Sequence, residues 1–161
     1  MDAAQRDGAL RQQLARLQGW GDAHADFDKA VEGLAPELRG RRPEGLPHSP
    51  WELVEHLRLA QHDILDFSRN PHYEEMRWPD DYWPPNPEPP SPEAWDASIA
   101  AYRADRDAME ALAADASVDL FAPIPHGSGQ TVLRELVLSA AHTSYHVGQL
   151  VLVRRLLGAW E

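Results

Sequence analysis

Two histidines four residues apart, His142 and His146, have the spacing in this sequence that points most directly to chemistry. They lie in the segment TVLRELVLSAAHTSYHVGQLVLVRRLL, residues 131–157, which has the apolar periodicity of a helix. Residues four apart lie one turn apart on one helix face, so both imidazoles can reach a single metal ion. The pattern is short and common, and two unrelated histidines on an amphipathic helix are the competing interpretation.

A metal site needs a third ligand, and His56 is the best candidate because it falls within the apolar face of another predicted helix. Three neutral imidazoles with one or two waters make an open site of the catalytic type. Zn²⁺ is the default ion for three nitrogens, while Ni²⁺, Fe²⁺ and Mn²⁺ stay open as alternatives. The other interpretation is a metal-free core, in which unsatisfied ring nitrogens cost about 1–3 kcal/mol each.

Other polar residues have weaker signals. His24 lies on an apolar seam and is expected to face the interior, either as a core histidine or beside the site. Gln149 shares a helix stripe with the histidine pair and is a candidate for orienting a ligand or water. His126 precedes the last helix in a glycine-rich loop, and its role is open. His48 and His62 are interpreted as surface or cap-adjacent residues.

Apolar periodicity predicts four helices and no strand. The second and third predicted helices each begin with a Ser-Pro pair, in which the serine caps the helix and the proline occupies its first turn. Gly19 and Gly21 weaken the first helix, so a kink or break near Trp20 is expected. The predicted helices span residues 4–38, 50–69, 92–114 and 131–157.

The segment 70–91 holds seven prolines, so neither a helix nor an inner strand fits it. Its aromatic residues, among them Trp78, Tyr82 and Trp83, predict an ordered connection rather than a flexible linker. The segment either packs purely for stability or closes over a pocket. A long connection between helices is typical of a crossover along a bundle, so the chain is predicted to be a single all-α domain over residues 1–161, a four-helix bundle.

Composition limits the class of function. The net charge is −11 with a single lysine, Lys29, which argues against a sequence-independent grip on nucleic acid. No apolar run approaches the roughly 20 residues of a membrane span, and no signal peptide is visible, so a cytoplasmic protein without membrane contact is expected. There is no cysteine, so a thiolate metal site and a disulfide are excluded.

Two motifs together resemble a known family. HSPWELVEHL, residues 48–57, and HTSYHVGQLVLVRRLLG, residues 142–158, are similar to signatures of the DinB-like superfamily, also called the DinB/YfiT group. The resemblance covers essentially the whole chain, including the proline-rich crossover. It implies an up-down-down-up bundle, frequently a homodimer, with a divalent metal held by His56, His142 and His146.

The same resemblance implies a class of reaction. The superfamily includes enzymes that transfer low-molecular-weight thiols such as bacillithiol, and mycothiol-dependent isomerases. A metal-dependent thiol S-transferase or hydrolase acting on a small-molecule substrate is therefore one expectation, and the absence of cysteine fits a thiol supplied by a cosubstrate. The alternative is a non-catalytic metal-binding stress-response or structural bundle protein.

Overall fold

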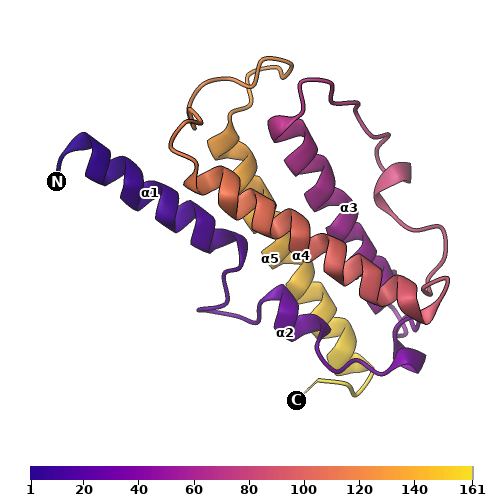
Figure 1. The fold of residues 1–161 in the computed structure, drawn as a ribbon. Helices are drawn as coiled ribbons and strands as arrows, with labels where there is room; N and C mark the ends of the chain where they lie inside the picture. The colour runs from indigo at the N-terminus through magenta and orange to yellow at the C-terminus, as the bar shows by residue number, and fades with distance from the viewer. Residues whose placement is uncertain (161) are drawn as a thin grey trace.

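The computed structural model describes residues 1–160, and this part of the chain is helical with no β-strand (Figure 1). The all-α class predicted from the sequence is confirmed. Two short 3-10 helices, η1 and η2, accompany five α-helices. The elements are α1 (Ala3–Gln18), α2 (Phe27–Val31), η1 (Pro36–Leu38), α3 (Pro50–Arg69), η2 (Asp80–Tyr82), α4 (Pro92–Ala114) and α5 (Val132–Leu156).

Local capping sets where the three longest helices begin. Ser49, Ser91 and Thr131 each accept a hydrogen bond from the backbone N–H three residues ahead, which satisfies one of the free donors of the first turn. At α3 the Glu52 side chain also accepts from the Ser49 backbone N–H, at 2.8 Å, and completes a capping box. These starts match the predicted ones because the caps are local sequence features.

The first predicted helix, 4–38, is wrong as a continuous element. It ends at Gln18 with Gly19 as its C-cap, and a new N-cap at Asp26 begins the short α2. Gly33 follows α2 with φ of +68°, a conformation that only glycine adopts at little cost. The break near Trp20 is confirmed, but the glycines separate two elements instead of kinking one helix.

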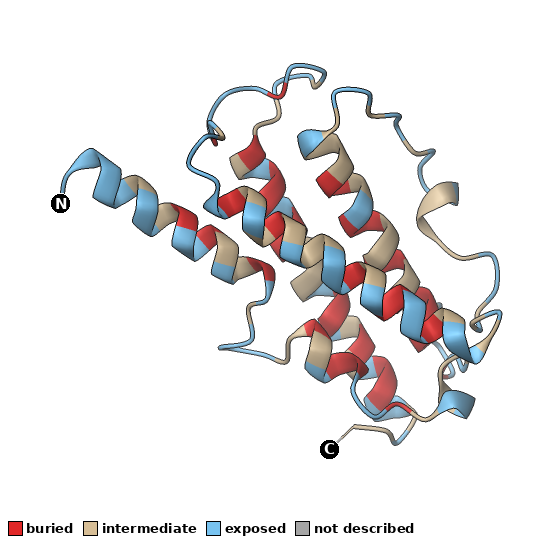
Figure 2. Cartoon of the chain, viewed as in Figure 1, coloured by how far each residue is buried: buried red, intermediate tan, exposed pale blue. Residues whose placement is uncertain are grey.

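The core lies between the long helices. α3 packs on both α4 and α5, and α1 packs mainly on α4. Figure 2 shows the buried residues gathered on the facing sides of these helices. In Figure 1, α3 and α4 run in the same general direction, because the segment between them returns along the bundle, and α5 runs the opposite way. The complete up-down-down-up order and the single-domain assignment stay predictions.

Within the described residues, α5 is the one helix long and apolar enough to cross a membrane by length and composition alone. The core helix of a bundle meets the same criteria. Its inner face packs in the core through Leu136, Ala140, Val147, Leu150 and Val153. This helix also carries two of the three candidate ligands.

Candidate metal centre

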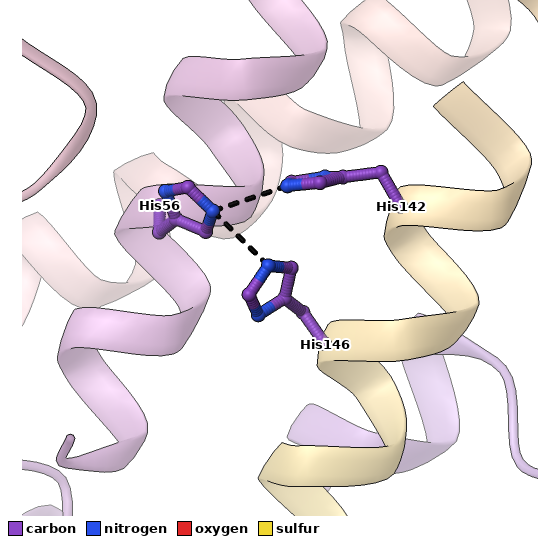
Figure 3. A group of neighbouring side chains, drawn as sticks. All are labelled: His56, His142 and His146. Carbon is purple, nitrogen blue, oxygen red and sulfur yellow. Dashed lines mark hydrogen bonds between the residues drawn. The ribbon is translucent and has the colours of Figure 1, made fainter. Parts of the chain in front are cut away.

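Helices α3 and α5 bring His56, His142 and His146 to one point (Figure 3). The Nε2 atom of His56 lies 3.1 Å from Nε2 of His142 and 3.2 Å from Nε2 of His146. One ring nitrogen from each residue lies within 4.8 Å of the other two. The pairing of the two helices therefore joins positions that are 86 and 90 residues apart in the sequence.

Burial keeps these rings neutral. His56 is 1% exposed and His146 is 8% exposed, and His142 is half-buried. Desolvation lowers the pKa of His56 to about 4 and that of His142 to about 3, and it also lowers the pKa of His146. Neutral imidazole is the form that binds a metal, so all three rings are in the ligand form at pH 7.

The outer nitrogen of His56 fixes its tautomer. Nδ1 lies 2.8 Å from the backbone carbonyl oxygen of Tyr82, which can only accept, so Nδ1 carries the proton. Trp83 stacks flat on the same ring, with centroids 3.9 Å apart and planes 2° apart. On its other face, Trp83 stacks on His48 with centroids 4.1 Å apart. The His56 ring is held in its plane, and its Nε2 lone pair points toward the other two histidines.

His146 has the same arrangement through a side chain. Its Nδ1 lies 2.7 Å from Oε1 of Gln149, so Nδ1 donates and Nε2 carries a lone pair. The close approach of His56 Nε2 and His146 Nε2, dashed in Figure 3, therefore sets two lone pairs against each other without a shared proton. A cation between these atoms turns that repulsion into attraction, so the donor set fits a metal ion.

The two nitrogen separations that involve His56 fit tetrahedral coordination. Two nitrogens about 2.0–2.1 Å from one zinc ion and separated by the tetrahedral angle lie about 3.3 Å apart. The observed separations of 3.1 and 3.2 Å match that edge. Within the described residues, His56, His142 and His146 are the only group of three or more His, Cys, Asp or Glu side chains with this convergence. Three protein ligands leave a fourth position for water or substrate.

The structure contradicts the expectation for His24. It is exposed, and its Nδ1 lies 2.8 Å from the carbonyl oxygen of the next residue, Ala25. The physical reason is that the helix ends at Gln18, so residue 24 does not lie on the apolar face of a continuous helix that would point its side chain inward. His24 therefore takes no part in the histidine cluster.

The remaining histidines lie outside the cluster. His126 is exposed and its Nε2 donates to the carbonyl oxygen of Phe67 at 2.8 Å. His62 is exposed beside Asp105, at 3.0 Å, as expected for a surface residue. His48 lies next to the cap of α3, as expected, but it also extends the ring stack on Trp83.

The contacts of the crossover with the cluster are not predicted in detail by the sequence. Three of its aromatic residues are expected either to close over a pocket or to pack for stability. Of these, Trp78 is 71% exposed, whereas Tyr82 and Trp83 contact His56. The contact from Tyr82 is made by a backbone carbonyl, for which the sequence carries no signal. The Trp83 stack has a weak signal, an aromatic residue in an ordered proline-rich segment.

Comparison with known protein families gives one match. The model of the DinB superfamily matches residues 20–150. The chain belongs to the DinB superfamily. No curated protein and no solved structure is detectably similar to it.

Membership and geometry agree on a coarse description. The chain is a DinB-like helical protein, and it carries a histidine cluster that is compatible with a divalent metal ion. The matched region contains both signatures that suggested the family, HSPWELVEHL and most of the segment that begins at His142. The identity of the ion and the reaction go beyond these findings.

Proposed function

We propose that His56, His142 and His146 hold one divalent metal ion, zinc by preference, and that the protein is a metal-dependent enzyme of the thiol S-transferase type. The observation that carries the proposal is the convergence of three neutral imidazoles. In two of them, His56 and His146, the outer N–H donates a hydrogen bond to an oxygen atom. Ni²⁺, Fe²⁺ and Mn²⁺ remain alternatives, because the same nitrogen donors suit them. When bound, the ion supplies Lewis acidity that lowers the pKa of a coordinated thiol or water.

The chain's own residues prepare this chemistry. The Tyr82 carbonyl and Gln149 Oε1 each hold a ring N–H, which keeps the ligand lone pairs aimed inward and raises their basicity. Trp83 covers one face of His56 and keeps water away from it. Because the chain has no cysteine, the reacting thiol comes from a small cosubstrate.

The test is a screen of low-molecular-weight thiols against small electrophiles with zinc-loaded and EDTA-stripped protein. We expect thioether formation that depends on the metal and that disappears in His142→Ala. Metal-independent turnover, or no turnover in any thiol and electrophile pair, would argue against the transferase assignment. His72→Ala is the matched control, because His72 is exposed and outside the cluster.

A structural metal in a non-catalytic bundle is the second candidate. Structural zinc sites usually fill all four positions with protein ligands, whereas the described residues supply three here. The melting temperature of His146→Ala separates the two cases. A small change in stability with loss of metal supports a functional site, and a large loss of stability supports a structural one.

A further inference from the structure

A cleft lies near the histidine cluster. It has a volume of about 620 Å³ and lies between the end of α3, the start of α5 and the crossover. Tyr82 joins it to the cluster, since its carbonyl accepts from His56 while its side chain lines the cleft. A cleft of this size takes a small molecule or one arm of a larger one.

The walls of the cleft combine aromatic faces with carboxylates. The rings of Phe67, Tyr73 and His126 pack against one another, with centroids 5.1 to 6.1 Å apart. Asp63 accepts the hydroxyls of Tyr73 and Tyr82 at 2.8 and 2.6 Å. Aromatic faces beside carboxylates are the arrangement that attracts organic cations.

The balance of charge in the cleft is negative. Three carboxylates line it, those of Asp63, Glu75 and Glu135, against one guanidinium, that of Arg134. The Arg134 side chain is 56% exposed, so solvent screens much of its charge. The cleft therefore disfavours anions and favours a positively charged group.

Glu135 is the most deeply buried of the three carboxylates. Its side chain is 2% exposed, and Arg134 donates to its Oε1 at 2.6 Å. Its other oxygen, Oε2, accepts no hydrogen bond from the described residues and is not fully buried, so it can face a charged group in the cleft. Because the side chain as a whole is little exposed, solvent screens this carboxylate less than it screens the Arg134 guanidinium.

The cleft has a defined distance from the histidines. Asp63 follows His56 by seven residues on α3, and Glu135 precedes His142 by seven residues on α5. The two helices are antiparallel here, since the hydrogen bond from Ser139 to Gln61 lies between the two levels. Both carboxylates therefore lie toward the same end of the bundle, two turns or about 10 Å from the histidines.

We propose that this cleft binds an organic ammonium group of the substrate, whose other end reaches the histidine cluster about 10 Å away. The proposal rests on the proposed function for its second half, because the reacting end is assigned to the metal site. The ammonium group contacts the carboxylates of Asp63 and Glu135 and the neighbouring aromatic faces. The substrate class is therefore an elongated amine.

The first test compares choline with its neutral isostere, 3,3-dimethylbutan-1-ol, by calorimetric titration of zinc-loaded protein. The two probes share shape and differ in charge. We expect choline to bind at least fivefold more tightly, with an affinity that falls as salt is raised. Equal binding of the two probes, or no binding of choline at 100 mM, would overturn the proposal.

Charge variants locate the site. Glu75→Gln should weaken choline binding about threefold, and Arg134→Gln should strengthen it by a similar factor, as expected for one charge several ångströms from the ligand in water. Glu135→Gln should weaken it at least tenfold. Glu74→Gln is the matched control, because Glu74 is exposed next to Glu75 and outside the cleft. An effect of Glu74→Gln as large as that of Glu75→Gln would contradict the assignment.

A span test separates this proposal from the proposed function. 8-Aminooctane-1-thiol reaches about 10 Å when extended, and it should bind zinc-loaded protein at least tenfold more tightly than octane-1-thiol or 2-aminoethanethiol. Zinc content is measured on the same samples. Bound zinc with no preference for the long aminothiol overturns the cleft assignment alone. Choline binding to protein that takes up no zinc overturns the metal function and the link between the two sites.

Discussion

His56 is the most constrained of the three histidines, because both of its ring nitrogens and one face of its ring are in contact with other residues. Nδ1 donates to the Tyr82 carbonyl, Nε2 faces the other two histidines, and Trp83 covers one face. Its position within the apolar face of α3 explains the low exposure of 1%. Such a residue is fixed before any ion arrives, which lowers the conformational cost of binding one.

Acid should weaken the metal-free protein. The unfolded chain takes up protons on histidine near its ordinary pKa of 6.5, whereas folding lowers the pKa of His56 to about 4 and that of His142 to about 3. Below pH 6.5 the unfolded state binds more protons, so stability falls as the pH decreases toward 3. Urea unfolding between pH 7.5 and 4 measures this.

The control compares two variants over the same pH range. His142→Asn should flatten the dependence, and His72→Asn, at an exposed position, should leave it as in the wild type. A slope that is the same in all three proteins would show that the buried rings do not cause it.

The crossover tryptophans provide a matched pair. Trp83→Ala removes the stack on His56 and His48, and should weaken zinc binding about 10- to 100-fold, as for other residues that orient metal ligands. Trp78→Ala should change nothing measurable in zinc affinity, since Trp78 is 71% exposed. Competition of the protein with a fluorescent zinc chelator gives both affinities. Equal affinities for the two variants would mean that the stack does not orient His56.

At the scale of elements, the caps determine where the helices start, and one cap has a second contact. The Ser49 hydroxyl accepts from the Glu52 N–H and donates to the carbonyl oxygen of Pro87 in the crossover. Ser49→Ala should therefore lower the free energy of unfolding by about 2 kcal/mol, against about 1 kcal/mol for Ser91→Ala, which loses a cap alone. Chemical denaturation compares them, and a smaller effect at Ser49 would count against the second contact.

What the sequence predicts depends on how local the determinant is. The starts of α3, α4 and α5 follow from Ser49, Ser91 and Thr131, each of which acts over three residues. The candidate ligands follow from spacing and apolar faces, and the structure brings them together. The break after Gln18 has only a weak sequence signal, the low helix propensity of Gly19 and Gly21. The helix cap at Asp26 completes the break, because it begins a new helix in place of a continuous one.

The contacts of the crossover depend on the path of the whole segment. The approach of the Tyr82 carbonyl to His56 joins residues 26 apart and uses a backbone atom that every residue has. The stack of Trp83 on His56 likewise depends on that path. No spacing rule predicts either contact, and the structure alone reveals them.

At the scale of the whole molecule, the outer face of α5 bears on the homodimer expected from the family resemblance. Large apolar side chains are exposed along that helix at Val137, Leu138, Tyr145, Leu152 and Leu156. We propose that a second copy of the chain covers this face. A row of exposed apolar side chains on one helix is typical of an interaction surface.

Light scattering after gel filtration tests the dimer. Tyr145→Glu places a charge at the middle of the apolar face and should give a monomer, while the wild type elutes as a dimer. Phe121→Glu, at an equally exposed apolar residue in a loop, should remain dimeric. A monomeric wild type, or loss of the dimer in both variants, would exclude α5 as the interface.

The most direct measurement is equilibrium dialysis of EDTA-stripped protein against zinc, with the metal-to-chain ratio determined for the wild type and for His56→Ala, His142→Ala and His146→Ala. We expect one ion per chain in the wild type and in His72→Ala, and loss of most of that zinc in each of the three cluster variants. A wild type that takes up no zinc, or cluster variants that retain a full equivalent, would contradict a metal centre at these histidines.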